Sequence, residues 1–432
     1  MRRSRLAGLF LVGGCLIVYL LFVKHHYSTS KPDSHGHSTH TPLQSHRTKQ
    51  DGYQYGIMFD AGSTGTRVHI FRFQMDNKEP KLDHETFRAI EPGLSAYADD
   101  PQQCSAGLVE LLNVAQSSVP RSMWTRTPVV LKATAGLRLL PGQKADQLLD
   151  KVRMLFHESP FLSRDDSVSI MDGTDEGISA WITINFLTGG LHSNGIPTVG
   201  MLDLGGGSTQ ITFSPRDEKT IQDLPVDSIR SFQMFNNTHT VYTHSYLGLG
   251  LMSARLAILE GPSSTTVPRG STELFSTCLP AEFSGTWEHA DIIYTVKGQK
   301  AEGLAYEACR SKVEKILFRK VMKASDVADV DFYAFSYYYD RAVNLGVIDE
   351  KRGGTITVSD YVQAAQRVCS SLTPDPLQSP FLCLDLVYIS VLLQELGIPP
   401  HKHLKLARTI NQVETSWALG ATFHYMETLK RP

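Results

Sequence analysis

The chain lacks the sequence features of several large classes of protein. Its 432 residues carry a formal net charge of -2, so no basic excess favours nucleic acid as a partner. There is no Cys-x-x-Cys pair, which argues against a zinc site. The Walker pattern Gly-x-x-x-x-Gly-Lys-Ser/Thr is missing, which excludes a P-loop enzyme, and the absence of a Gly-x-Ser-x-Gly elbow argues against an esterase. With 41% hydrophobic and 20% charged residues, the composition is that of a globular protein of roughly two to three domains.

One uncharged apolar run, Leu6–Val23, lies near the N-terminus and follows three arginines. Its length is at the short end of a transmembrane span, and no Ala-x-Ala cleavage pattern precedes Lys24. Because basic flanks stay in the cytosol, we predict a signal anchor at 6–23, a cytosolic tail at 1–5 and a polar luminal stem at 24–52. Cleavage after the anchor would release a soluble form.

Six cysteines suit a luminal compartment. Cys15 lies in the predicted span, and Cys104 is left over. The other four permit three pairings. We predict the pairing of nearest neighbours, Cys278–Cys309 and Cys369–Cys383. The sequon at Asn236 would accept a glycan in the same compartment.

The stretch Gly56–Phe71 is predicted to be a hairpin with a turn of small residues. Its turn contains Ser63, Thr64 and Gly65, which offer hydroxyls and backbone amides to a phosphate. Asp60, at the edge of the turn, is placed to hold a cation beside that phosphate. An ordinary hairpin turn capped by the aspartate is the alternative.

The same pattern recurs at Gly200–Phe213. Asp203 corresponds to Asp60, and the turn that follows is richer in glycine. We therefore predict an internal duplication, with two similar lobes that face each other across a cleft. The phosphate-binding residues predicted for the second turn are Gly205, Gly206, Gly207, Ser208, Thr209 and Gln210.

Other short strands also end at polar turns, where ligands bind in α/β folds. One strand, Pro128–Ala133, leads to Thr134, and another, Val168–Met171, leads to a Gly-rich stretch that contains Glu176. Glu176 is the predicted general base for a hydrolytic water; a helix N-terminal carboxylate is the alternative. Helices are expected at 103–118, 144–156, 178–186, 246–259, 301–322, 358–369, 384–396 and 415–429.

Five blocks in the chain resemble the conserved regions of the ectonucleoside triphosphate diphosphohydrolases, the apyrase-like nucleoside phosphatases. They are DAGSTGTR (60–67), ATAGLR (133–138), DGTDEGISAW (172–181), LDLGGGSTQ (202–210), and the pair AFSYYYD (334–340) with ETSWALGA (414–421). Their order and spread over nearly the whole luminal chain make the resemblance specific. The single N-terminal anchor is similar to that of the Golgi and secreted members of the family.

The resemblance implies an α/β fold of two actin-like, ribonuclease H-like lobes with the active site between them. Lobe I would comprise 53–171 plus 408–432, and lobe II 172–407. Glu176 matches the general base. Asp60, Thr134, Glu176, Asp203 and Gln210 match positions that hold Ca²⁺ or Mg²⁺, largely through water.

The resemblance also places Tyr339 as the residue that stacks on the base, although core packing is the alternative for each tyrosine of 337–339. For the second side of the base pocket, the segment Phe381–Tyr388 has no obvious aromatic match to the family; it carries Asp385, and we hypothesise that Asp385 reads guanine. The four luminal cysteines match the two family disulfides.

The function implied is divalent-cation-dependent hydrolysis of nucleoside diphosphates, with GDP, IDP and UDP preferred over triphosphates. The enzyme would be a single-pass type II protein of the Golgi membrane, in part secreted, that supports glycosylation; a monomer is expected. The rivals are a kinase or chaperone-like ATP-binding protein of the same fold and an inactive luminal nucleotide-binding protein.

Overall fold

The computed structural model describes residues 52–75, 80–191, 195–216, 221–222, 224–261, 271–290, 292–371 and 379–429. They fall within one compact unit, Gly52–Pro432. The predicted anchor at 6–23 and all of the predicted stem except Gly52 lie outside the described residues. Among the helices that the structure does describe, none has the length and apolar character needed to cross a membrane.

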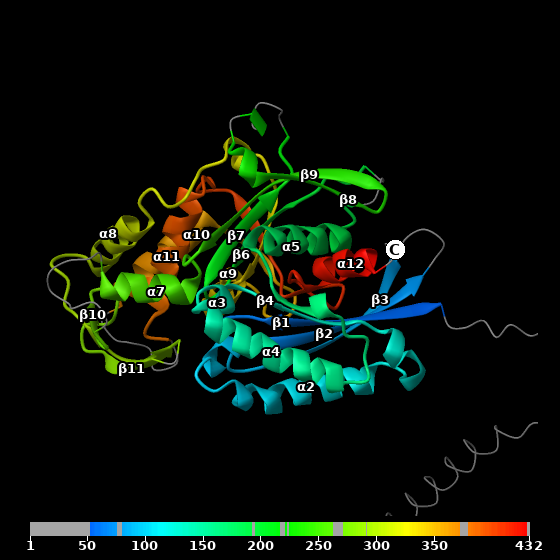
Figure 1. Ribbon diagram of the computed structural model, residues 1–432. Helices are drawn as coiled ribbons and strands as arrows, with labels where there is room; N and C mark the ends of the chain where they lie inside the picture. The colour runs from blue at the N-terminus through cyan, green and yellow to red at the C-terminus, as the bar shows by residue number, and fades with distance from the viewer. Residues whose placement is uncertain are drawn as a thin grey trace, which may run out of the picture. The chain divides into compact units, whose positions relative to one another are not determined.

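Two sheets carry the fold, and both contain the same arrangement of five strands (Figure 1). In the first sheet the order is β3-β2-β1-β4-β5; β2 is antiparallel to β1 and β3, whereas β4 is parallel to β1 and β5. In the second sheet β9-β7-β6-β13-β15 repeats this order and these directions. Strands β8 and β14 extend its two edges. The repeat confirms the internal duplication that the two turns predict.

The strands of the first sheet are β1 (Tyr53–Ala61), β2 (Thr66–Met75), β3 (Pro80–Ile90), β4 (Val129–Ala133) and β5 (Val168–Ile170). Those of the second are β6 (Gly200–Leu204), β7 (Ser208–Phe213), β8 (Ile229–Met234), β9 (Asn237–Leu247), β13 (Phe332–Ser336), β14 (Gly354–Thr357) and β15 (His403–Leu406). The short hairpin β16 (Thr409–Ile410) and β17 (Val413–Glu414) leads from the second sheet back to the first.

Two helices fill the space between the sheets: α5 (Gly173–Thr188) packs on β6, β7 and β9, and α12 (Ala418–Thr428) packs on β1 and β2 (Figure 1). The helices approach closely because both have small residues at the crossing. A methyl group on Gly420 would lie 2.1 Å from the Ser179 carbonyl oxygen. The C-terminal helix α12 packs on the first sheet, although it follows the second sheet in the sequence.

The outer face of each sheet has its own apolar core. On the first sheet this core is covered by α2 (Cys104–Ser118) and α4 (Gly142–Glu158). On the second it is covered by α7 (Leu251–Glu260), α8 (Ala305–Leu317), α9 (Tyr337–Asn344), α10 (Val358–Cys369) and α11 (Leu382–Glu395). A short helix, α3 (Ala135–Arg138), follows β4.

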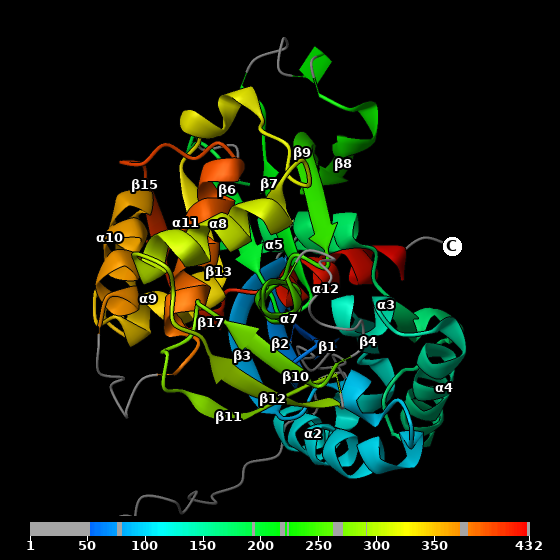
Figure 2. The same cartoon turned by 90° about the vertical axis from the view of Figure 1, so that its left-hand side faces the viewer.

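A third, three-stranded sheet lies beside α7 (Figure 2). It consists of β10 (Glu273–Ser276), β11 (Ser284–His289) and β12 (Ile292–Gly298). Two disulfides fasten this half of the molecule, Cys278–Cys309 and Cys369–Cys383, which confirms the predicted pairing. Cys104 is a buried free thiol, and burial raises its pKa to about 11.

Three sequence-based expectations for secondary structure need correction. The helix expected at 246–259 begins only at Leu251, because Tyr246 and Leu247 still belong to β9. The helix expected at 301–322 is shorter, Ala305–Leu317, since Gly303 adopts a positive φ of 98° before it. Helix α5 begins at Gly173 and not at 178, because the Asp172 side chain accepts a hydrogen bond from the Thr174 amide and caps it.

Candidate active site

The two Gly-rich turns have the same geometry. In each, the amide of the first glycine donates to the carbonyl oxygen three residues on: Gly62 to Gly65 at 3.0 Å and Gly205 to Ser208 at 3.1 Å. The preceding aspartates take equivalent places in their sheets, Asp60 opposite Arg67 and Asp203 opposite Gln210. The sequence pattern of a strand, an aspartate and a small-residue turn therefore forms twice, as predicted.

The structure brings the two turns into contact. A methyl group on Gly206 would lie 2.4 Å from the Ser63 hydroxyl oxygen and 2.9 Å from the Thr64 methyl carbon. A methyl group on Gly136, two residues after Thr134, would likewise lie 2.9 Å from the Ser63 Cα. Only residues without a side chain allow the turns to approach this closely, which explains why glycine recurs at these positions.

Glu176 lies in the first turn of α5 and is 6% exposed. Its Oε2 atom accepts hydrogen bonds from Arg138 Nη2 at 2.6 Å and from Gln210 Nε2 at 3.2 Å. Ser208 joins the same network, because its hydroxyl is 2.8 Å from Gln210 Nε2 and 3.2 Å from Arg138 Nη2. The second turn and the predicted base are thus directly linked.

The glycines beside Glu176 allow α5 to lie close to the second sheet. A methyl group on Gly173 would meet the Ser245 hydroxyl at 2.4 Å, and one on Gly177 would meet the Thr212 hydroxyl at 2.7 Å. These close contacts bring the Glu176 carboxylate within reach of the Gln210 side chain on β7.

Three buried carboxyl groups influence one another here. Burial raises the pKa of Glu176 to about 8; Arg138 opposes the shift, while Asp203 and Asp60 add to it. Burial also raises the pKa values of Asp60 and Asp203, against the effect of Arg67 on Asp60 and of the Ser336 hydroxyl on Asp203. Such a cluster of carboxyl groups is stabilised by bound protons or by a cation.

The two aspartates differ in how their oxygens are satisfied. Asp60 Oδ2 accepts from Arg67 Nη1 at 3.3 Å, but Asp60 Oδ1 is buried and has no hydrogen-bond partner. Asp203 Oδ1 accepts from the Ser336 hydroxyl at 2.7 Å. The free oxygen of Asp60 is the kind of hard donor that Ca²⁺ and Mg²⁺ prefer.

Among the described residues, no group of three or more His, Cys, Asp or Glu side chains is close enough to hold a metal ion on its own. The donor set fits an ion bound by one or two carboxylates, with water and phosphate oxygens as its other ligands, which is the usual arrangement for Mg²⁺.

Of the remaining predicted residues, Thr134 and Thr209 contact the turn segments, whereas Tyr339 and Asn236 lie on other elements. Thr134 directly follows β4, and its amide donates to the Ala61 carbonyl at 3.1 Å. The Thr209 hydroxyl donates to the Asp203 carbonyl at 2.7 Å, so this side chain supports the turn. Tyr339 is 4% exposed, and its hydroxyl donates to the Glu350 carbonyl. Asn236 is exposed at the tip of the β8–β9 hairpin.

Three residues were missed when the site was predicted: Arg67, Arg138 and Ser336. Each arginine is the last residue of a block that carries the family resemblance, DAGSTGTR or ATAGLR. A basic residue after a small-residue turn is the sequence signal that could have identified both arginines as site residues. Ser336 has φ 54°, a value rare outside glycine, and its side chain orients Asp203.

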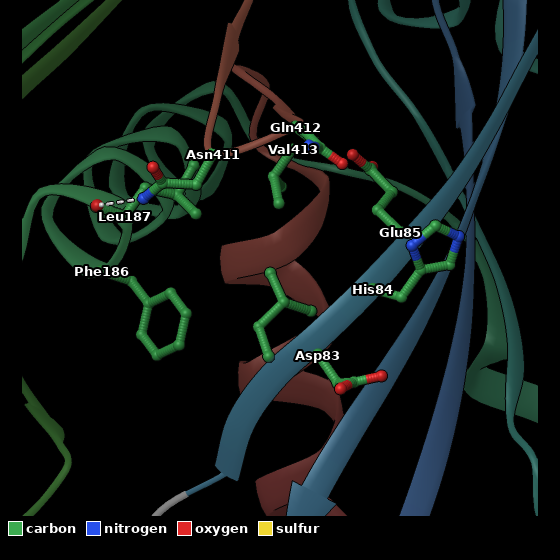
Figure 3. Close-up of a pocket in the computed structure, with 9 residues that line it drawn as sticks. Asp83, His84, Glu85, Phe186, Leu187, Asn411, Gln412 and Val413 are labelled. Atoms are coloured by element: carbon green, nitrogen blue, oxygen red, sulfur yellow. Dashed lines mark hydrogen bonds between the residues drawn. The ribbon is translucent and has the colours of Figure 1, made fainter.

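A separate polar pocket of about 170 Å³ lies between β3, the end of α5 and the β16–β17 hairpin (Figure 3). Its lining residues are Leu82, Asp83, His84, Glu85, Phe186, Leu187, Asn411, Gln412 and Val413, none of which is a predicted site residue. Glu85 accepts hydrogen bonds there from the Glu414 amide, and it pairs with the buried His69. The buried carboxyl groups of the candidate site lie beside the two turns and not in this pocket. The polar groups of the pocket join β3 to the β16–β17 hairpin.

A duplicated α/β unit with two small-residue turns around buried carboxylates defines a class of proteins that handle phosphate groups. The chain belongs to the GDA1/CD39 (nucleoside phosphatase) family, whose model matches residues 46–431. It is therefore an enzyme of the nucleoside phosphatase type, and the family resemblance drawn from the five blocks is confirmed.

Two relatives illustrate the likeness. Ectonucleoside triphosphate diphosphohydrolase 6 of Mus musculus is 54% identical over 427 residues, which cover 96% of this chain and 93% of the relative. Nucleoside diphosphate phosphatase ENTPD5 of Homo sapiens is 49% identical over 378 residues, or 87% and 88% of the two chains. A crystal structure of nucleoside triphosphate hydrolases from Neospora caninum has the same fold, with a TM-score of 0.62 at 16% identity over 88% of this chain and 94% of that one.

Proposed function

We propose that the chain hydrolyses nucleoside diphosphates to nucleoside monophosphate and phosphate with the help of Ca²⁺ or Mg²⁺, and that it prefers GDP, IDP and UDP to triphosphates. The observation that carries the proposal is Glu176, buried and bonded to Arg138 and Gln210 beside the two turns. A relative named as a nucleoside diphosphate phosphatase supports the choice of substrate.

In this proposal the terminal phosphate lies between the two turns. Hydroxyls of Ser63, Thr64 and Ser208, with amides of Gly65, Gly206 and Gly207, would donate to its oxygens. The contact between Gly206 and Ser63 brings the two turns together, which supports a phosphate site formed by both of them.

Glu176 would accept a proton from the attacking water, and Gln210 would orient the carboxylate. Arg138 donates to Glu176 Oε2 and holds it beside the Ser208 hydroxyl. Asp60 and Asp203 would hold the cation, with Thr134, Glu176 and Gln210 contributing through water. The cation would supply charge neutralisation for the leaving phosphate and would favour the ionised form of Glu176.

Tyr339 is proposed to stack on the base, as the family resemblance implies. Tyr339 lies in α9, which follows directly from β13 in the second sheet. The proposed active site therefore takes residues from both sheets and from the helix between them, as expected for a two-lobed, actin-like arrangement.

We further propose that the enzyme works in the secretory pathway, in the Golgi membrane, anchored through residues 6–23 and in part released by cleavage. The two disulfides and the exposed sequon at Asn236 support an oxidising, glycosylating compartment. There it would remove nucleoside diphosphates left by glycosyltransferases.

The test is phosphate release from GDP, IDP, UDP, CDP and the triphosphates with Ca²⁺, Mg²⁺ or a chelator, for the parent chain, Glu176→Ala and Glu176→Gln. We expect diphosphates to be the better substrates, the chelator to abolish activity, and both variants to lose about 10²- to 10⁴-fold in kcat. Activity that survives both substitutions would refute the role of Glu176. Nucleotide binding without phosphate release in the parent would favour the inactive binding protein instead.

A further inference from the structure

Asp385 lies in the first turn of α11 and is completely buried between two arginines. Its Oδ1 atom accepts hydrogen bonds from Arg255 Nε at 3.2 Å and Nη2 at 2.9 Å. Its Oδ2 atom accepts from Arg255 Nη2 at 2.8 Å and from Arg341 Nε at 2.8 Å. With both oxygens bound in this way, the carboxylate has no free edge to offer a guanine, which argues against the hypothesis that Asp385 reads the base.

Arg255 is equally enclosed and is 5% exposed. Its guanidinium carbon lies 4.2 Å from the centre of the Phe381 ring and 5.5 Å from that of Trp287. A buried, doubly hydrogen-bonded pair of this kind fixes the relative position of its two helices, because any shift leaves a charge unpaired in an apolar environment. The pair therefore fixes α7, which carries Arg255, to α11.

Helix α7 in turn holds the second Gly-rich turn from behind. The amides of Leu251 and Met252, in its first turn, donate to the carbonyl oxygens of Gly205 and Gly206 at 2.8 and 2.9 Å. The amide of Gly248, just before the helix, donates to the Gly207 carbonyl at 2.8 Å. All three carbonyl oxygens of the turn are thus bound on the α7 side, so none is left to repel an anion on the other side.

A second contact from α11 holds the start of α7. One helical turn beyond Asp385, the hydroxyl of the buried Tyr388 donates to the Leu249 carbonyl at 2.6 Å. Close packing completes the contact, since a methyl group on Gly250 would lie 2.4 Å from the Ser208 amide nitrogen. The position of the turn therefore depends on α11 through α7, although no residue of α11 has to touch a phosphate.

We propose that Asp385 is a positioning residue for phosphate binding: through Arg255 and α7 it sets the place and the orientation of the Gly205–Gly207 turn. The inference rests on the proposed role of this turn as a phosphate cradle. A displacement of the turn by about 1 Å would weaken its contacts with the phosphate of every nucleotide alike, with a loss on the order of 10²-fold in rate.

The test compares Asp385→Asn and Tyr388→Phe with the parent chain. Ser390→Ala serves as a matched control, because its buried hydroxyl bonds only to the Val387 carbonyl of the same helix. Three quantities are measured: the inhibition constant of inorganic phosphate, kcat/KM for GDP and for CDP, and the midpoint of thermal unfolding.

We expect Asp385→Asn to raise the inhibition constant of phosphate and to lower kcat/KM for GDP and CDP by the same factor, on the order of 10²-fold. Tyr388→Phe loses one hydrogen bond and should show the same pattern at roughly fivefold to tenfold. The control should match the parent. Because Tyr388→Phe leaves no charge unpaired, it decides the question if Asp385→Asn does not fold.

Two outcomes would overturn this inference while leaving the proposed function intact. A change in the GDP to CDP ratio with an unaltered phosphate constant would restore the role of Asp385 in reading the base. A lower unfolding temperature with unaltered kinetics would mean that the pair only stabilises the fold. A parent chain that releases no phosphate from any nucleotide would instead refute the proposed function.

Discussion

The two Gly-rich turns have the same backbone but different surroundings. Both follow an equivalent strand and close with the same hydrogen bond. Around the first turn, Asp60 keeps one buried oxygen without a partner, and Ser63 and Thr64 are partly exposed. Around the second, Asp203 is held by Ser336, and every carbonyl of the turn is bound on the α7 side.

The difference indicates that the two copies of the turn have different roles. Arg67 and Gln210 occupy the same place in the repeat, opposite the aspartate, yet Arg67 pairs with Asp60 while Gln210 donates to Glu176. In the proposed mechanism, the first copy thus offers a free oxygen to a cation, and the second copy is connected to the proposed base, Glu176. Under the same proposal, duplication provides the two turns that bind the phosphate, and substitution at one equivalent position gives each turn its own role.

The largest effect that would test this comparison is expected from Asp60→Asn set against Asp203→Asn. Both remove one carboxylate charge, but only Asp60 has a fully buried oxygen without a hydrogen-bond partner. We expect Asp60→Asn to raise the Mg²⁺ concentration needed for half-maximal activity by about 10²-fold, and Asp203→Asn by roughly tenfold. Titration of activity with Mg²⁺ and with Ca²⁺ measures both. Equal shifts would show that the two aspartates hold the cation in the same way.

A smaller effect is expected from reduction of the disulfides, because both lie in the half of the chain that carries the second turn. Each bridge typically contributes about 2–4 kcal/mol. Reductant should therefore lower the unfolding temperature, and it should do so less in a chain with Cys369→Ser and Cys383→Ser. The effect should persist in Cys104→Ser, since Cys104 forms no bridge. A melting temperature that does not respond to reductant would count against both bridges.

The sequence was sufficient to predict the features that depend on short segments. A turn such as Gly205–Gly207 is specified by its own residues, because only glycine permits close approach from several sides. The pairing of cysteines 31 and 14 residues apart was predictable for a similar reason, since nearby thiols close short loops. Because the turn occurs twice in the sequence, the duplicated sheet was also predictable.

Contacts between distant residues were not predictable in this way. Arg138 and Glu176 are 38 residues apart, and Ser336 and Asp203 are 133 apart. Neither pair has a local pattern, since each is created by neighbouring parallel strands that end at one edge of a sheet. Asp385 shows the same limit: the sequence led to the hypothesis that it reads guanine, whereas its partners Arg255 and Arg341 come from two other helices.

The last prediction concerns the stability of the protein without a cation and follows from the burial of Glu176, beside Asp60 and Asp203. Burial raises the folded-state pKa of Glu176 to about 8, whereas the unfolded-state value is about 4.3. Between these two pH values the unfolded state releases a proton that the folded state keeps, so stability falls as pH rises from about 4.3 towards 8. Glu176→Gln removes this titration.

We therefore expect Glu176→Gln, measured with a chelator present, to unfold at a higher temperature than the parent at pH 7.5, and the difference to shrink as the pH is lowered towards 5. Added Mg²⁺ should reduce the difference, because a cation favours the ionised carboxylate in the folded state. Glu110→Gln, at an exposed position on α2, provides the control and should show no comparable pH dependence. A variant less stable than the parent at every pH would mean that the bonds from Arg138 and Gln210 to Glu176 outweigh the cost of its burial, and the second turn would then stabilise the fold as well as orient the base.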